Sequence, residues 1–226
     1  MFPLRDTIRS RTFPVVNISL IVINILIYIY EFSLGKGIES FVTHFGLTPV
    51  RFFWSLQHNI PDAVIPIFSS MFLHGDWFHV LSNMWFLYIF GDNVEDRTGH
   101  AGYLVFYLLC GVGAALSQAF FFRGSTIPMV GASGAIAGVL GAYFLLFPHS
   151  RILTLVPIFI FLQLIEIPAV IFLIFWFVIQ FISGAMMSSG SQGGVAWWAH
   201  IGGFLFGMLL IFVFKKPEKR EEPYWN

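Results

Sequence analysis

Long uncharged stretches separate the charged residues of the chain, and their lengths predict membrane-spanning helices. A helix that crosses the hydrocarbon core of a bilayer, which is about 30 Å thick, needs about 20 mostly apolar residues. Six stretches have a length and composition that suit such a helix, and we predict six spans. They cover approximately residues 12–30, 77–91, 101–122, 131–148, 167–185 and 195–214.

A seventh apolar stretch, residues 152–165, is only 14 residues long and contains Pro157. Stretches of that length are more typical of interfacial or re-entrant segments than of spans. Counting it as a span would also place the two ends of the chain on opposite sides of the membrane. We therefore expect it to form a hydrophobic loop on the cytoplasmic side.

Basic residues at the two ends of the chain predict its orientation. Cytoplasmic segments of membrane proteins carry an excess of Lys and Arg. Three arginines precede the first predicted span and four basic residues follow the last, in the tail 215–226. We therefore expect both termini in the cytoplasm. The segment 31–76 then forms a long external loop, and its aromatic residues predict that it lies partly in the membrane interface.

Composition excludes several other classes of protein. Hydrophobic residues make up 57% of the chain and charged residues 11%, whereas a soluble domain carries about 25% charged residues. The 12 basic and 12 acidic side chains cancel, so no basic patch for nucleic acid is expected. The single cysteine, Cys110, allows no internal disulfide or cysteine-ligated zinc site. We predict an all-α, single-domain, multi-pass protein of a cell (inner) membrane, with no cofactor or metal.

A few polar side chains within the predicted spans identify candidate functional residues, because such groups are costly in a membrane. His79 and Asn83 lie early in the second span, Ser133 near the start of the fourth, and His200 near the start of the sixth. With a cytoplasmic N-terminus, these three spans all run from outside to inside. At 1.5 Å per residue, the four side chains can lie at similar depth in the outer half of the membrane.

Glycines close to these residues predict tight helix packing. The pairs Gly134/Gly138 and Gly203/Gly207 are both GxxxG sequences, one after the candidate serine and one after the candidate histidine. Small residues let helix backbones approach closely in lipid, and Gly131 belongs to the same set. Such packing would bring the serine hydroxyl within reach of the imidazole.

A serine hydroxyl beside an imidazole can perform nucleophilic acyl transfer, because the imidazole removes the hydroxyl proton. No aspartate lies on the external side of the two spans to orient the ring, so the sequence predicts a Ser133–His200 dyad rather than a triad. The side chains of His79 and Asn83 can donate to an oxyanion. The backbone N–H of the serine, near a helix start, can supply a third donor.

Other polar residues receive structural interpretations. We expect Gln180, in the fifth span, to bond a neighbouring helix rather than a substrate. Glu95 and Arg97 are expected to form a structural bridge in a cytoplasmic loop. Asp76 is expected to cap the helix that follows it, and His74 to have a structural or interfacial role.

The ordered motifs of this chain resemble those of the rhomboid family of intramembrane serine proteases. The resemblance covers about residues 64–214, and the combination of motifs in this order is highly specific. The motifs are HxxxN at residues 79–83, ExRxG at 95–99, GxSG at 131–134 and AHxxG at 199–203, followed by Gly207.

The resemblance implies a six-helix bundle in which Ser133 is the nucleophile and His200 the general base, while His79 and Asn83 stabilise the oxyanion. It implies hydrolysis of peptide bonds in or near transmembrane segments of substrate proteins, towards the outer face of the lipid bilayer. It also implies that the fifth span and the loop after it form a mobile gate. In this sequence Ala137 stands where some relatives have a Tyr that stacks on the base.

The sequence bears on three other classes of function. A non-catalytic binder or chaperone of transmembrane helices stays open, although inactive rhomboid relatives usually lack the nucleophile or the base. A transporter or channel is disfavoured because no inverted repeat or pair of broken helices is evident. An intramembrane metalloprotease would need an HExxH motif, which the sequence lacks. The Ser188–Gly194 loop is expected to help open a wet cavity to the outside, and the oligomeric state is left open.

Overall fold

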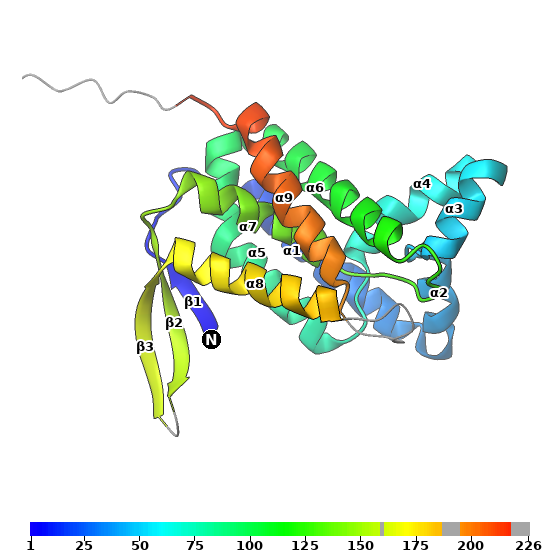
Figure 1. Ribbon diagram of the computed structural model, residues 1–226, viewed down its shortest axis with the longest axis horizontal. Coiled ribbons are helices and arrows are strands. Elements are labelled where there is room, and N and C mark those ends of the chain that lie inside the picture. The colour runs from blue at the N-terminus through cyan, green and yellow to red at the C-terminus, as the bar shows by residue number, and fades with distance from the viewer. Residues whose placement is uncertain (159–160, 187–194, 218–226) are drawn as a thin grey trace, which may run out of the picture.

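The computed structural model describes residues 1–158, 161–186 and 195–217. These residues form a bundle of helices with a small β-sheet projecting from one end (Figure 1). Each of the six predicted spans corresponds to one long helix of the bundle. These helices are α1 (Val15–Ser33), α5 (Trp77–Thr98), α6 (His100–Phe121), α7 (Ser133–Leu146), α8 (Ala169–Met186) and α9 (Trp197–Phe214).

Four of these helices, α1, α6, α8 and α9, are long and apolar enough to cross a membrane by length and composition. The other two differ for separate reasons. Helix α5 has 22 residues but carries several charges near its C-terminal end, and α7 has only 14 residues. At 1.5 Å per residue, α7 is about 21 Å long, which is shorter than the hydrocarbon core of a bilayer.

Helix α7 lies at the centre of the bundle. Every residue from Gly134 to Tyr143 is buried, as expected for a helix that is apolar on all sides. Its closest neighbour is α9, and the predicted glycines form the contact. A Cβ added to Gly203 would collide with the carbonyl of Gly134, and one added to Gly207 would collide with that of Gly138. The backbones of α7 and α9 therefore lie very close together at these glycines.

Two long helices include acidic residues that lie beyond the predicted spans. Helix α1 continues past residue 30 through Glu31, whose buried carboxylate accepts a hydrogen bond of 3.1 Å from the backbone N–H of His74. Helix α5 continues past residue 91 through the charged segment 92–98. The predicted spans were ended at the first charged residue. In the structure the helices continue, because some of these carboxylates are buried and accept hydrogen bonds from backbone N–H groups.

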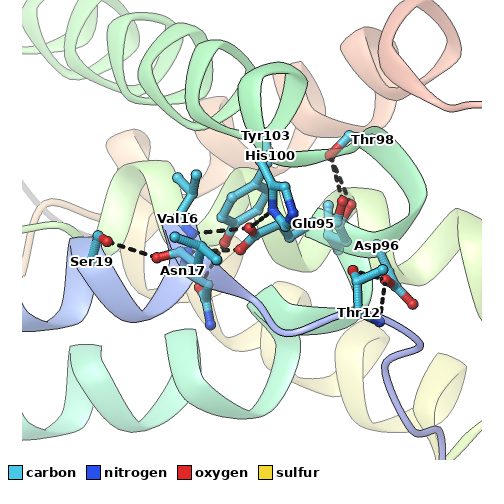
Figure 2. Close-up of polar contacts among 11 residues, drawn as sticks. Thr12, Val16, Asn17, Ser19, Glu95, Asp96, Thr98, His100 and Tyr103 are labelled. Carbon is cyan, nitrogen blue, oxygen red and sulfur yellow. Dashed lines mark hydrogen bonds and ion pairs between the residues drawn. The ribbon is translucent and has the colours of Figure 1, made fainter.

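Glu95 shows how such a carboxylate joins two helices. It accepts hydrogen bonds from the backbone N–H groups of Val16 at 3.0 Å and Asn17 at 2.7 Å, and it also contacts the His100 ring (Figure 2). The first N–H groups of a helix lack partners within the helix, and an anion there interacts favourably with the helix dipole. Glu95 is therefore a bridge from α5 to the start of α1, within a helix rather than in the expected loop.

The segment before α1 and the segment after α9 both contact this same end of α5. The backbone N–H of Thr12 donates to the carboxylate of Asp96 at 3.0 Å. The backbone N–H of Lys216 donates to the carbonyl of Arg97 at 2.7 Å. Both segments thus lie beside the C-terminal end of α5, which suits an even number of crossings. The predicted tail lies mostly outside the described residues.

A three-stranded antiparallel sheet corrects the all-α prediction. Strand β1 (Phe2–Asp6) pairs with β2 (Arg151–Ile158), which pairs with β3 (Phe161–Pro168). The stretch expected to be a hydrophobic loop is therefore a hairpin, and β3 leads directly into α8. Its Ile, Leu, Val and Thr residues suit a pleated, half-buried surface, and β1 supplies a third strand from the far end of the chain.

The segment predicted as an external loop folds into short helices that support the start of α7. These helices are α2 (Ile38–Phe45), α3 (Pro49–His58) and α4 (Ile60–Ser69). Two contacts link them to the residues before α7. Leu47 forms an isolated β-bridge with Met129, and the Ser70 carbonyl accepts a hydrogen bond of 2.9 Å from the backbone N–H of Gly131.

Candidate active site

The candidate nucleophile is the first residue of the central helix. Helix α7 begins at Ser133, and Gly131 lies two residues earlier with a φ of 128°, a conformation that favours glycine. A Cβ at this position would lie 2.8 Å from the Nε2 and Cε1 atoms of His79 and 3.5 Å from Ser133 Oγ. The missing side chain therefore lets the His79 ring and the serine hydroxyl approach the same point. Gly131 is close-packed, but against the His79 side chain rather than against a helix backbone.

His200 contacts the serine hydroxyl directly. Its Nε2 atom lies 2.8 Å from Ser133 Oγ, so the predicted contact between the two helices is present. The imidazole is buried, with 8% of its surface exposed, and the serine is half-buried. This contact depends on the glycine-mediated packing of α7 against α9, because a wider separation would carry the ring out of hydrogen-bonding range.

The other ring nitrogen of His200 has a partner on a third helix. Its Nδ1 atom lies 2.7 Å from Oε1 of Gln180, which is buried in α8. A carbonyl oxygen only accepts hydrogen bonds, so this bond places the proton on Nδ1 and leaves a lone pair on Nε2. The expectation that Gln180 bonds a neighbouring helix is confirmed. The identity of its partner, the candidate base, was not predicted.

Aromatic side chains pack around the imidazole where Ala137 leaves no ring on α7. The Trp176 ring of α8 lies 5.9 Å from the His200 ring at an interplanar angle of 35°, and the Trp197 ring lies 6.2 Å away, edge-on. The adjacent Trp198 stacks on Phe121 of α6, with ring centroids 3.8 Å apart. Trp176 was not singled out in the sequence, because a Trp in an apolar span gives no sign of the direction it faces.

Helix α5 supplies the two candidate oxyanion donors. Asp76 caps this helix by accepting a hydrogen bond of 2.8 Å from the backbone N–H of His79, as predicted. The Nδ1 atom of His79 accepts a long hydrogen bond of 3.4 Å from the backbone N–H of Gly75. This favours a proton on Nε2, the nitrogen that faces Gly131. One turn further along α5, Asn83 is buried, and its Nδ2 atom has no hydrogen-bond partner within the described part of the chain.

Two buried residues, His74 and Glu31, support His79. The His74 ring packs edge-on against the His79 ring, with centroids 5.1 Å apart. Its backbone N–H bonds to the carboxylate of Glu31 in α1. The structural role expected for His74 is therefore found beside the site. Glu31 was missed, because it was treated as the boundary of the first span.

A small cavity adjoins Ser133. Glycine and alanine residues from three helices form much of its lining, among them Gly111 of α6, Gly134 of α7 and Ala199 of α9. Ser70 also lines this cavity. The Ser188–Gly194 loop, expected to open this region to the outside, lies outside the described residues. Within the ranges that the structure describes, no group of three or more His, Cys, Asp or Glu side chains could hold a metal ion.

Comparison with known proteins decides the family. The Rhomboid domain family matches residues 61–217 of the chain. The chain belongs to the rhomboid family. It is thus a rhomboid-type, integral, multi-pass membrane protein, as the motifs predicted.

Several curated rhomboids are similar in sequence. Rhomboid-like protein 11, chloroplastic, of Arabidopsis thaliana is 36% identical over 121 residues, which are 53% of this chain and 38% of that protein. Rhomboid protein 1, mitochondrial, of Saccharomyces cerevisiae is 28% identical over 175 residues, 74% of this chain and 47% of that protein. The human presenilin-associated rhomboid-like protein, mitochondrial, is 29% identical over 178 residues, which are 73% of this chain and 41% of that protein.

This rhomboid spans less than half the length of those three relatives. Their names place them in chloroplasts or mitochondria. The expected location in a cell inner membrane is therefore not supported by the comparisons, whereas an integral membrane location is.

Proposed function

We propose that this rhomboid is an intramembrane serine endopeptidase that hydrolyses peptide bonds in or near transmembrane segments of membrane proteins. The observation that carries the proposal is the 2.8 Å contact between His200 Nε2 and Ser133 Oγ. With the proton on Nδ1, the free lone pair of Nε2 faces the hydroxyl and can accept its proton. Two residues from separate helices thus form a Ser–His dyad.

In the first half of the reaction, Ser133 Oγ attacks the carbonyl carbon of the scissile peptide bond and its proton passes to His200 Nε2. The carbonyl oxygen becomes an oxyanion. We assign its stabilisation to the Nε2–H of His79, the unpartnered Nδ2 of Asn83 and the backbone N–H of the serine. The C–N bond then breaks, the imidazolium gives its proton to the leaving amine, and an acyl-enzyme remains.

In the second half, a water molecule attacks the acyl-enzyme and gives a proton to His200 Nε2. The second tetrahedral intermediate collapses, the bond from the carbonyl carbon to Ser133 Oγ breaks, and the serine recovers its proton. The cavity beside the serine supports this step, because Ser70 and Ser133 are among its lining residues and can offer polar contacts to a water molecule. The small residues around it also leave room for a small substrate side chain.

We further propose six spans with both termini in the cytoplasm and the dyad in the outer half of the bilayer. The segment before α1 and the segment after α9 both bond to the C-terminal end of α5, which supports an even number of crossings. The short α7 supports a nucleophile that lies within the depth of the bilayer, because about 21 Å of helix cannot span about 30 Å. Entry of a substrate helix would then occur laterally from the lipid.

Cleavage of a single-span substrate tests the proposal. Purified protein is incubated with the substrate in detergent or liposomes, and mass spectrometry locates the cut. We expect cleavage in or near the transmembrane segment by the wild type, and none by Ser133→Ala or His200→Ala. Equal cleavage by either variant would contradict the assigned roles. Stable binding of the substrate without cleavage by the wild type would instead favour a non-catalytic binder of transmembrane helices.

A further inference from the structure

Gln180 contacts the candidate base from the side opposite the nucleophile. It lies in α8, whereas His200 lies in α9 and Ser133 in α7, so the three side chains come from three helices. The amide Oε1 is 2.7 Å from Nδ1 of the imidazole, and Nε2 of the same ring is 2.8 Å from the serine Oγ. Gln180 is also among the buried polar residues of the chain, with 6% of its surface exposed.

The acceptor atom on Gln180 decides which tautomer the imidazole adopts. A neutral imidazole carries one proton and has one nitrogen free to accept. When Oε1 accepts from Nδ1–H, Nε2 is the free nitrogen and can take the serine proton. An imidazole with its proton on Nε2 instead would present a donor to the hydroxyl and could not act as the base.

We infer that Gln180 is a positioning residue, which holds the imidazole of His200 in the tautomer and orientation that the proposed serine hydrolysis requires. The inference rests on the proposed function and deepens it. A neutral amide adds no charge beside the imidazolium that forms during the reaction. Its contribution is therefore the geometry and tautomer of the ring, rather than the electrostatic stabilisation that an aspartate supplies in a triad.

The location of Gln180 couples this geometry to α8. Much of α8 faces away from the bundle, with Ile171, Phe175, Ile182 and other large apolar residues exposed. Its inner side reaches α9 at Gly184, where an added Cβ would lie 3.1 Å from Trp197. The base is thus aligned only while α8 lies against α9, and a displacement of α8 removes the acceptor from Nδ1.

A packing role is the competing explanation, because the Trp176 and Trp197 rings also hold the imidazole. Two substitutions separate the two explanations. Gln180→Met keeps a side chain of similar volume but removes the acceptor. Gln180→Glu keeps an acceptor oxygen and adds a negative charge.

The experiment measures cleavage of a single-span substrate and the rate of labelling by a fluorophosphonate as functions of pH. We expect Gln180→Met to lower kcat and the labelling rate by between about 10- and 100-fold, a loss within the range for weakened general-base catalysis, with KM changed less than about threefold. We expect Gln180→Glu to restore both rates to within about tenfold of the wild type. It should also move the acidic limb of the pH profile to higher pH, because a carboxylate favours the imidazolium.

The residues around the His200 ring allow the shift in the pH profile to be assigned to one contact. The side chains that face His200 are Ser133 of α7, Gln180 and Trp176 of α8, and Trp197 of α9. The other titratable side chain at the site is His79 of α5, whose ring lies beside Gly131, and both variants retain it. A pH shift confined to the Glu variant therefore reports on the Nδ1 contact.

Gln118→Met is the matched control. Gln118 of α6 also bonds α9, but its Oε1 accepts from the backbone N–H of Ala199 at 3.2 Å rather than from the imidazole. We expect this variant to lower thermal stability in detergent and leave the shape of the pH profile unchanged. Wild-type rates for Gln180→Met, or equal losses in the Met and Glu variants, would overturn the inference while leaving the proposed function intact. An inert wild type would contradict the proposed function, and the inference would fall with it.

Discussion

Gly203 of α9 lies against the backbone carbonyl of Gly134 in α7, so closely that a Cβ on Gly203 would collide with it. Gly134 is one position after Ser133, and Gly203 is three positions after His200. The contact between the helices therefore lies directly beside the contact between the hydroxyl and the imidazole. Packing and the geometry of the candidate site depend on the same small residues.

We expect Gly203→Ala to destabilise the protein and to reduce proteolysis. The added methyl group forces α9 away from α7, and overpacking of this kind costs about 1–3 kcal/mol. The measurement is the melting temperature in detergent together with the cleavage rate. Gly102→Ala is the matched control, because it lies in α6 with its nearest neighbour at an ordinary 3.7 Å. The control should be neutral or stabilised, since Ala favours a helix, and equal melting temperatures for both variants would contradict the packing argument.

Asn83 should show opposite effects on activity and stability. Its buried Nδ2 has no partner within the described part of the chain, which is costly for folding but suits a donor that waits for an oxyanion. We expect Asn83→Leu to lower kcat by about 100-fold or more and to leave the melting temperature unchanged or raised. An activity loss accompanied by a large loss of stability would indicate a structural role instead.

Glu95→Ala should destabilise the bundle without changing the geometry of the candidate site. The carboxylate accepts from two backbone N–H groups at the start of α1, and leaving buried donors without partners costs about 1–3 kcal/mol each. The free energy of unfolding in detergent is the relevant measurement. Glu39→Ala, an exposed acidic residue in α2, is the control and should change it by less than about 0.5 kcal/mol. Similar losses in both variants would argue against the bridge.

Asp6 should make stability depend on pH. Its carboxylate accepts hydrogen bonds from the Tyr143 hydroxyl and from Nδ2 of Asn93, and burial raises the pKa of Asp6 from 3.8 to about 6. The folded protein thus keeps this proton up to about pH 6, whereas the unfolded chain releases it near pH 4. Stability conferred by the protonated group is full below about pH 4 and is lost as the pH rises to about 6.

Asp6→Asn should remove this dependence, because the amide oxygen still accepts from Tyr143 but does not titrate. Melting temperatures of both proteins between pH 4 and pH 7 provide the measurement. The variant should gain stability relative to the wild type as the pH rises through this range. A difference that stays constant with pH would show that the Asp6 carboxyl does not titrate in the expected window.

The sequence predicted the helices and the contact at the candidate site for a common reason. Apolar length locates spans directly, and polar groups inside spans are few enough that Ser133 and His200 stand out. The GxxxG pairs then predicted which helices approach closely. These features depend on local composition and short spacing, which a single sequence contains.

Other features depend on contacts between distant segments. Strand β1 pairs with β2 across more than 140 residues of sequence, so neither the sheet nor the hairpin could be deduced from apolar length alone. Glu31 was treated as the boundary of the first span, and Glu95 was placed in a loop. The backbone N–H groups that donate to these carboxylates lie in other elements, far away in the sequence. The Gln180 contact depends on how α8 is rotated about its axis, which its nearly uniform apolar sequence does not specify.

Mapping a fluorophosphonate adduct tests the central claim most directly. The reagent needs an activated serine but no substrate, so its reaction isolates the Ser133–His200 pair from questions of substrate entry. We predict that mass spectrometry finds the adduct on Ser133 in the wild type. We also predict no adduct in His200→Ala, provided that its melting temperature in detergent is close to that of the wild type. A wild type that cleaves a substrate without forming this adduct, or equal labelling in the His200→Ala variant, would contradict the account.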